Sequence, residues 1–97
     1  MRIIRHVIVR GLVQGVGYRA FVEHEAHRHG LRDWVRNRRD GSVEAVFAGP
    51  RAMVEDMIEI CRRGPFSARV DGLDHRDGSD ADLGASDADT FSVLPTI

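Results

Sequence analysis

The sequence predicts an α+β fold in which two helices cover one face of an antiparallel sheet. Three features support this prediction: β-branched stretches that alternate every two residues, two apolar stripes at helical spacing, and a hairpin pattern between those stripes. A chain of 97 residues is of ordinary size for one domain. We therefore expect residues 1–97 to form a single domain.

The first strand and the first helix are joined by a glycine-containing loop. Residues 3–10 are mostly β-branched, and we expect Gly11 to end this strand. A helix is predicted over residues 18–29, because Gly30 stands where a C-terminal cap belongs. Its stripe at helical spacing consists of Tyr18, Phe21, Val22, Ala26 and His29.

A β-hairpin is predicted after this helix. Residues 31–38 and 42–48 both alternate between apolar and polar side chains, and Asp40-Gly41 between them is a turn signal. One helix would then cross over between the first two strands. We therefore expect those two strands to point the same way, with their C-terminal ends on one side of the sheet.

The second half of the chain predicts another helix and two short strands. The helix begins at Pro50, ends near Gly64, and has an apolar stripe. That stripe consists of Met53, Val54, Met57, Ile58 and Cys61. Strands are predicted over residues 67–72 and 91–94. The connection over residues 71–90, rich in Asp, Gly, Ser and Ala, is expected to be mobile and partly disordered.

The order of these elements predicts a known α+β arrangement. Strand, helix, strand, strand, helix and strand, followed by a short terminal strand, form a split βαβ unit of ferredoxin-like type, written βαββαβ plus one strand. Both helices would lie on the same face of the sheet. The strand-to-helix loop and the end of the hairpin's first strand would then converge.

Charge is distributed unevenly along the chain. All 14 basic side chains are Arg, which excludes lysine Schiff-base chemistry and a P-loop lysine. Residues 2–39 carry nine of these Arg, whereas residues 71–89 carry seven Asp and one Arg. The first half therefore suits an anionic ligand, and the second is typical of a solvated loop.

The chain shows no feature of export or membrane insertion. The strongest apolar run, Val7–Val9, is far too short to span a bilayer. Residues 1–10 lack the pattern of a signal peptide, so we expect a cytoplasmic protein without a membrane partner, and a monomer. The single Cys61 cannot form an intramolecular disulfide, and its place in an apolar stripe predicts a small buried hydrophobe rather than a reactive thiol.

The loop of residues 11–19 has the properties of an anion site. Its glycines can turn backbone N–H groups toward one concave surface, and the following helix adds the positive end of its dipole. Arg19, in the first helical turn, presents a planar fork of donors that matches two phosphate oxygens. An ordinary solvated arginine is the alternative interpretation of Arg19. Residues 15–20 also match a dinucleotide fingerprint weakly, but the repeated βαβ units of that fold are absent.

Two sequence motifs resemble the signatures of the acylphosphatase family. The first signature reads Gly-x-Val-Gln-Gly-Val-x-Phe-Arg, and the chain matches it with Gly11, Val13, Gln14, Gly15, Val16 and Arg19, with Tyr18 in the Phe position. The second signature is matched by Trp34, Val35, Asn37, Gly41, Val43 and Gly49. Asp33 replaces the first Gly of that signature and adds negative charge near the anion site, unless Arg32 or Arg36 neutralises it.

The resemblance implies hydrolysis of the carboxyl-phosphate bond of acyl phosphates, with no metal and no cofactor. Arg19 takes the position of the family's phosphate-binding arginine, and Asn37 that of the asparagine that positions the attacking water. The substrate's phosphate would be bound by Gln14, Gly15, Val16, Gly17, Tyr18 and Arg19. Inorganic phosphate or sulfate would compete as anions. Without the resemblance, Asn37 would be interpreted as a polar residue that fixes the hairpin.

The sequence disfavours three other functions. His24, His27 and His29 point in different directions around a helix, so they cannot converge on one metal ion. Residues 77–82 resemble part of a calcium loop but lack its bidentate Glu. Nucleic-acid binding on the sheet would need paired exposed aromatic residues, and the strands offer only Trp34, Phe47 and Phe91. A regulatory domain, of the kind fused to hydrogenase-maturation carbamoyltransferases, is a further alternative to an enzyme.

Overall fold

The computed structural model describes residues 1–84 and 90–97. Its elements, in chain order, are β1 (Arg2–Leu12), α1 (Tyr18–Arg28), β2 (Arg32–Asn37), β3 (Val43–Pro50), α2 (Arg51–Arg63), β4 (Arg69–Asp77), the short 3-10 helix η1 (Asp80–Asp82) and β5 (Phe91–Val93). The sheet has the strand order β4-β1-β3-β2-β5. This arrangement confirms the predicted α+β, ferredoxin-like fold class.

The sheet is mixed rather than wholly antiparallel. β3 lies antiparallel to both β1 and β2, so these two strands point the same way. β5, however, pairs in parallel with β2, so the prediction of an antiparallel sheet was wrong for this strand. The reason is that β4 ends beside the start of β1, and residues 78–84 then reach the start of β2, where Gly84 contacts Asp33. β5 therefore runs beside β2 in the same direction.

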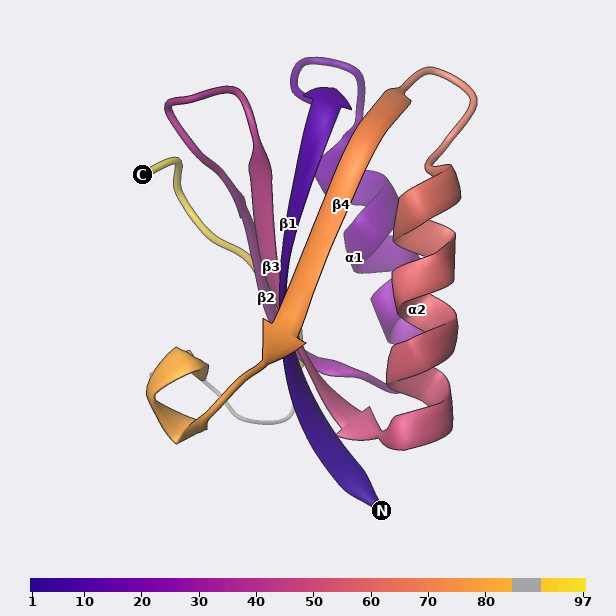
Figure 1. Cartoon of the computed structure of the whole chain (residues 1–97), viewed down its shortest axis with the longest axis vertical. Helices are drawn as coiled ribbons and strands as arrows, with labels where there is room; N and C mark the ends of the chain where they lie inside the picture. The colour runs from indigo at the N-terminus through magenta and orange to yellow at the C-terminus, as the bar shows by residue number, and fades with distance from the viewer. Residues whose placement is uncertain (85–89) are drawn as a thin grey trace.

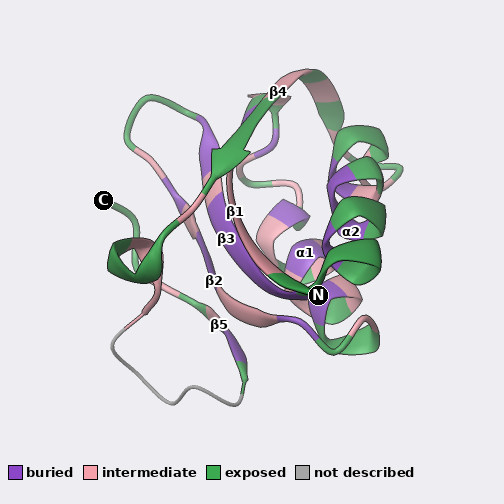
Figure 2. Cartoon of the chain, turned by 60° about the horizontal axis from the view of Figure 1, so that its bottom comes forward, coloured by how far each residue is buried: buried purple, intermediate pink, exposed green. Residues whose placement is uncertain are grey.

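Both helices pack on one face of the sheet, as Figure 1 shows. Figure 2 shows that the buried residues lie where the helices face the strands. In the core, Phe47 of β3 stacks on Phe91 of β5 with ring centroids 5.5 Å apart. The α2 stripe is confirmed except at Met53, which is 38% exposed. Val54, Met57, Ile58 and Cys61 already fill the buried face, and Met53 lies just outside it.

β1 continues past the glycine that was expected to end it. The register between β1 and β4 shifts at Arg10 and Gly11, which marks a β-bulge. Gly11 has φ 135°, and a Cβ atom there would stand 2.1 Å from the Arg69 carbonyl oxygen. The prediction of a strand end was therefore wrong, because glycine here permits close backbone approach within a continuing strand.

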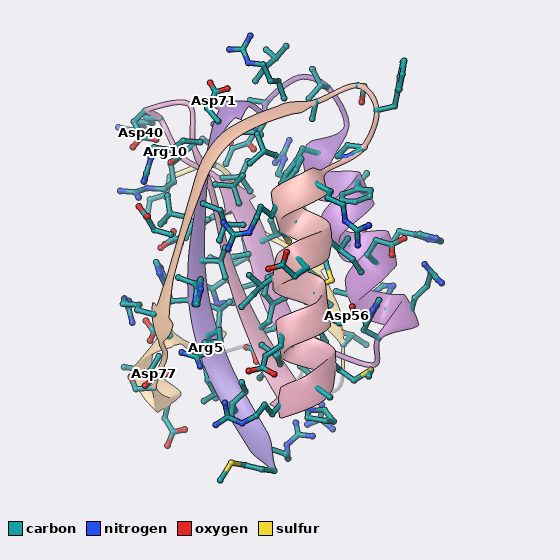
Figure 3. All side chains as sticks on the ribbon, turned by 45° about the vertical axis from the view of Figure 1, so that its right-hand side comes forward. Arg5, Arg10, Asp40, Asp56, Asp71 and Asp77 are labelled. Carbon is teal, nitrogen blue, oxygen red and sulfur yellow. The ribbon has the colours of Figure 1, made fainter. Side chains whose placement is uncertain are left out.

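β4 is longer than predicted, since residues 73–77 belong to the strand rather than to a loop. Two of its aspartates pair with β1: Arg5 donates to Asp77 (Figure 3), and Arg10 donates to Asp74. β4 forms one edge of the sheet, so its polar side chains stay largely exposed. That exposure explains why its composition is typical of a loop.

The remainder of the predicted mobile connection is partly structured. Trp34 Nε1 donates to the carbonyl oxygen of Asp82 at 2.9 Å, which holds η1 against the sheet. Residues 85–89 of the same prediction lie outside the described residues. No helix in the described part of the chain is long and apolar enough to cross a membrane.

Candidate active site

The loop between β1 and α1 exposes backbone donors on one side. Gly15 and Gly17 have φ values of 74° and 80°, and no atom lies within 4 Å of the position that a Cβ would occupy at either residue. Consecutive turns of this kind direct N–H groups into a concave nest that binds anions. Gly17 is also the N-cap of α1 and has no side chain, so N–H groups of the first helical turn stay available to a ligand.

Two side chains attach this loop to its neighbours. Gln14 Nε2 donates to the carbonyl oxygens of Arg38 and Ser42, at 2.7 and 2.8 Å, and so ties the loop to the β2–β3 hairpin. Ser67 Oγ donates to the carbonyl oxygen of Val16 at 2.7 Å. The Val16 carbonyl and the Gly17 N–H belong to one trans peptide, in which C=O and N–H point in opposite directions. The bond from Ser67 therefore turns the N–H of Gly17 away from Ser67.

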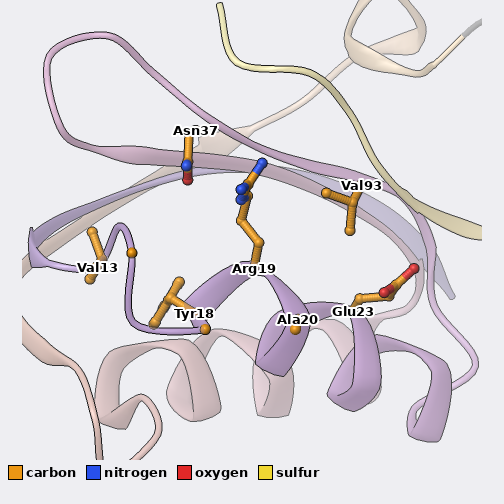
Figure 4. Close-up of a pocket in the computed structure, with 9 residues that line it drawn as sticks. Val13, Tyr18, Arg19, Ala20, Glu23, Asn37 and Val93 are labelled. Carbon is orange, nitrogen blue, oxygen red and sulfur yellow. The ribbon is translucent and has the colours of Figure 1, made fainter.

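Arg19 and Asn37 meet at one cavity of about 280 Å³ (Figure 4). Arg19 extends from the first turn of α1 toward the sheet, and Asn37 ends β2 above the loop. The convergence follows from β1 and β2 pointing the same way. The cavity is lined by Val13, Gly15, Gly17, Tyr18, Arg19, Ala20, Glu23, Asn37 and Val93.

The side chain of Asn37 is buried but unpaired. It is 9% exposed, and its Oδ1 has no hydrogen-bond partner within the described chain. The hairpin is instead held by Asp40 Oδ1, which accepts from the backbone N–H and the Oγ of Ser42 at 2.9 and 2.6 Å. Those two bonds also lower the pKa of Asp40. The interpretation of Asn37 as a residue that fixes the hairpin therefore has no support in these contacts.

The predicted phosphate-binding residues divide into two groups. Gly15, Gly17, Tyr18 and Arg19 line the cavity, whereas Gln14 and Val16 do not. The structure instead shows that Gln14 and Val16 fasten the loop to the rest of the protein.

Four residues of the cavity wall were not among the predicted binding residues, and these are Val13, Ala20, Glu23 and Val93. One signal could have found Glu23, because side chains four residues apart share a helix face and Glu23 follows Arg19 at that spacing. Val93 comes from β5, far away in the sequence, and no local pattern identifies it.

Tyr18 in place of the family's Phe is accommodated by a specific bond. Its ring is buried, and its hydroxyl donates to the carbonyl oxygen of Cys61 at 2.7 Å. Burial raises the pKa of Tyr18, so the hydroxyl stays protonated as a donor. Burial also raises the pKa of the Cys61 thiol to about 12, and this residue is 1% exposed. The prediction that Cys61 is a small buried hydrophobe is confirmed.

Asp33, which replaces a family glycine, adopts a conformation that favours glycine. Its φ is 143°, and its Oδ1 accepts from the backbone N–H of Gly84 at 2.8 Å. Its side chain does not line the cavity. Arg36, one of the two residues expected to neutralise it, donates instead to Glu44 at 2.7 Å and lies over the Trp34 ring, 4.6 Å from its centroid.

The histidines of the first helix and of its C-terminal cap bond separate partners in the described chain. His27 Nε2 bonds the Phe91 carbonyl oxygen at 3.1 Å, while His29 Nε2 bonds Asp56 at 2.7 Å. Among residues 1–84 and 90–97, no three His, Cys, Asp or Glu side chains group as metal ligands.

The aromatic side chains of the strands are not placed for nucleic-acid binding. Trp34, Phe47 and Phe91 are all buried, at 7%, 0% and 2% exposure, so none presents a face on which a base could stack.

Comparison with known proteins identifies the family of this chain. The family model described as acylphosphatase matches residues 5–89. An acylphosphatase of Rhodopseudomonas palustris strain BisB18 is 58% identical over 96 residues, covering 98% of this chain and 97% of that protein. The crystal structure of acylphosphatase from Bacillus subtilis matches with a TM-score of 0.84 and 32% identity, covering 97% and 99% of the two chains. An acylphosphatase structure from Coxiella burnetii matches with a TM-score of 0.83 and 31% identity, covering 96% and 93%. The chain therefore belongs to the acylphosphatase family, enzymes that hydrolyse acyl phosphates.

Proposed function

We propose that this enzyme cleaves the carboxyl-phosphate bond without a metal ion, by in-line attack of a water molecule that Asn37 positions. The observation that carries the proposal is the buried, unpaired Oδ1 of Asn37, which shares one cavity with Arg19 and the glycine loop. Buried polar atoms are nearly always hydrogen-bonded in native proteins. An acceptor left open at a cavity wall suits a ligand or a water molecule that arrives with the substrate.

The phosphoryl group would be held by the loop and by Arg19. The N–H groups around Gly15 and Gly17 bind its oxygens, and the Arg19 guanidinium donates two parallel bonds to two of them. The loop is held in place before the substrate arrives by the bonds of Gln14 and Ser67. The N–H groups of the loop therefore stabilise the charge that develops on the phosphoryl oxygens in the transition state.

The chemical step needs little else from the protein. The oxygen of the attacking water forms a bond to phosphorus while the bond from phosphorus to the acyl oxygen breaks, and that electron pair leaves on the carboxylate. A carboxylate is a weak base and departs without a strong general acid. The proton of the water passes to a phosphoryl oxygen, so the products are a carboxylate and inorganic phosphate. Positioning and electrostatic stabilisation thus account for catalysis.

The test is hydrolysis of synthetic benzoyl phosphate in the presence of EDTA. We expect full activity after prolonged dialysis against the chelator, and competitive inhibition by inorganic phosphate and by sulfate, because both anions fit the same donors. Activity that EDTA abolishes and a divalent ion restores would refute the metal-free mechanism. A folded protein that does not accelerate the hydrolysis at all would refute the proposed activity itself.

A further inference from the structure

The cavity extends beyond the part that the phosphoryl group would occupy. In Figure 4 the loop lies on one side of Arg19, and Glu23 and Val93 lie on the other. The loop side provides the N–H groups that a phosphate needs. The opposite side is walled by a carboxylate and a methyl-bearing side chain, which have no role in binding phosphate. It is therefore the space left for the acyl group.

The carboxylate of Glu23 is not engaged elsewhere. It is half-buried, and it makes no hydrogen bond or ion pair with any residue in the described part of the chain. Arg19 also forms no ion pair within the described residues, although it lies one helical turn away on the same face. An i,i+4 pair with the basic residue first is the weaker orientation on a helix. Once Arg19 binds phosphate, Glu23 is left to interact with the rest of the substrate.

A carboxylate at this place is costly for the binding of a phosphate unless the ligand also offers positive charge. Residues four apart on a helix are separated by about 6 Å along its axis. A positive group a few bonds beyond the acyl carbonyl can therefore reach Glu23 while the phosphoryl group contacts Arg19. Val93, 39% exposed, would contact the carbon chain between them. The cavity thus offers contacts suited to phosphate, to a short apolar linker and to a cation, in that order.

We propose that Glu23 selects the substrate by charge: the enzyme favours acyl phosphates whose acyl chain carries a positive group and disfavours those with a negative one. The proposal rests on the proposed hydrolysis of acyl phosphates at this site. Glu23 acts on binding and orientation of the acyl group, and the reaction itself proceeds at Arg19 and Asn37 as described above.

The test compares three substrates of similar length: 3-aminopropanoyl phosphate, butanoyl phosphate and 3-carboxypropanoyl phosphate, which are cationic, neutral and anionic in the acyl chain. The kcat/KM of each is measured for the wild type and for Glu23→Gln. Dividing the wild-type value by the variant's value for each substrate cancels that substrate's intrinsic reactivity. Glu59→Gln, which removes the same charge from an exposed position on α2, is the matched control.

We expect this quotient to be about threefold to fivefold larger for the cationic substrate than for the neutral one, which corresponds to a partly exposed ion pair. It should be smaller for the anionic substrate than for the neutral one. Added salt should weaken both differences, and Glu59→Gln should show neither. Equal quotients for all three substrates with Glu23→Gln would overturn the role of Glu23. If the wild type hydrolysed none of the three, the proposed function would fail instead, so the two failures are distinguishable.

Discussion

Truncation of Asn37 to Ala separates catalysis from stability. The side chain makes no hydrogen bond within the described chain, so Asn37→Ala breaks none. The melting temperature should therefore change little. If Asn37 orients the attacking water, kcat should fall by about two to three orders of magnitude, which corresponds to about 3 to 4 kcal/mol.

Three measurements on purified protein decide this prediction. They are steady-state kinetics with benzoyl phosphate, calorimetric titration with inorganic phosphate, and thermal unfolding. Phosphate affinity should be largely kept, because the donors of the loop and Arg19 are intact. Asn37→Asp should weaken both affinity and rate, since it places a negative charge beside an anionic substrate.

Asp40→Ala is the matched control for a role in the hairpin. It removes the acceptor of two hydrogen bonds from Ser42, so it should lower the melting temperature. If Asn37→Ala unfolded the domain in the same way, the hairpin interpretation would be right. If a folded Asn37→Ala lost phosphate binding, Asn37 would belong to the phosphate site rather than to the water.

Substitutions at three further residues test other parts of the structure. Arg19→Lys keeps the charge but loses the two-point fork, so kcat/KM should fall by about two orders of magnitude or more. A near-native kcat/KM would assign phosphate recognition to the loop alone. Ser67→Ala releases the carbonyl of Val16, so phosphate affinity should fall about fivefold with little change in melting temperature. Ser67→Thr should restore the phosphate affinity. If calorimetry gave Ser67→Ala the same phosphate affinity as the wild type, the loop would hold its shape without this bond. Burial acts to raise the pKa of Glu44, but hydrogen bonds from His6 and Arg36 outweigh burial and lower that pKa from 4.5. Ionised Glu44 therefore stabilises the fold above pH 4.5. This stabilisation is lost as the pH falls through the lowered pKa. Glu44→Gln should therefore lose about 1 to 3 kcal/mol of unfolding free energy at pH 7 and less in acid, by urea denaturation; a deficit that grew in acid would contradict the sign.

The parts of the fold that sequence predicts well have strong local signals. α1 and α2 combine helical periodicity with Gly30 and Gly64 at their ends, and the structure places both within one or two residues of the prediction. β4 lacks such a signal. Two of its aspartates, Asp74 and Asp77, pair with arginines of β1 that are more than sixty residues away. Its strand character therefore depends on tertiary pairing.

The candidate site shows the same division. The positions of Arg19 and Asn37 follow from two signatures in the sequence, and the crossover between parallel-pointing strands predicts that they converge. The contact between Ser67 and Val16 joins segments distant in sequence, and Val93 reaches the cavity only because β5 pairs with β2. The φ of 143° at Asp33 could not be predicted either, because Asp is not the residue that this conformation favours.

The long exposed edge of β4 has a consequence for solubility. An unpaired edge strand of nine residues offers a row of backbone N–H and C=O groups to which a strand of another molecule could add. Here that edge is lined by acidic and basic side chains, and Asp74 and Asp77 are 70% and 89% exposed. A second copy approaching edge to edge would have to desolvate these charges. We therefore expect the charged side chains of this strand to disfavour intermolecular β-sheet aggregation of the folded enzyme.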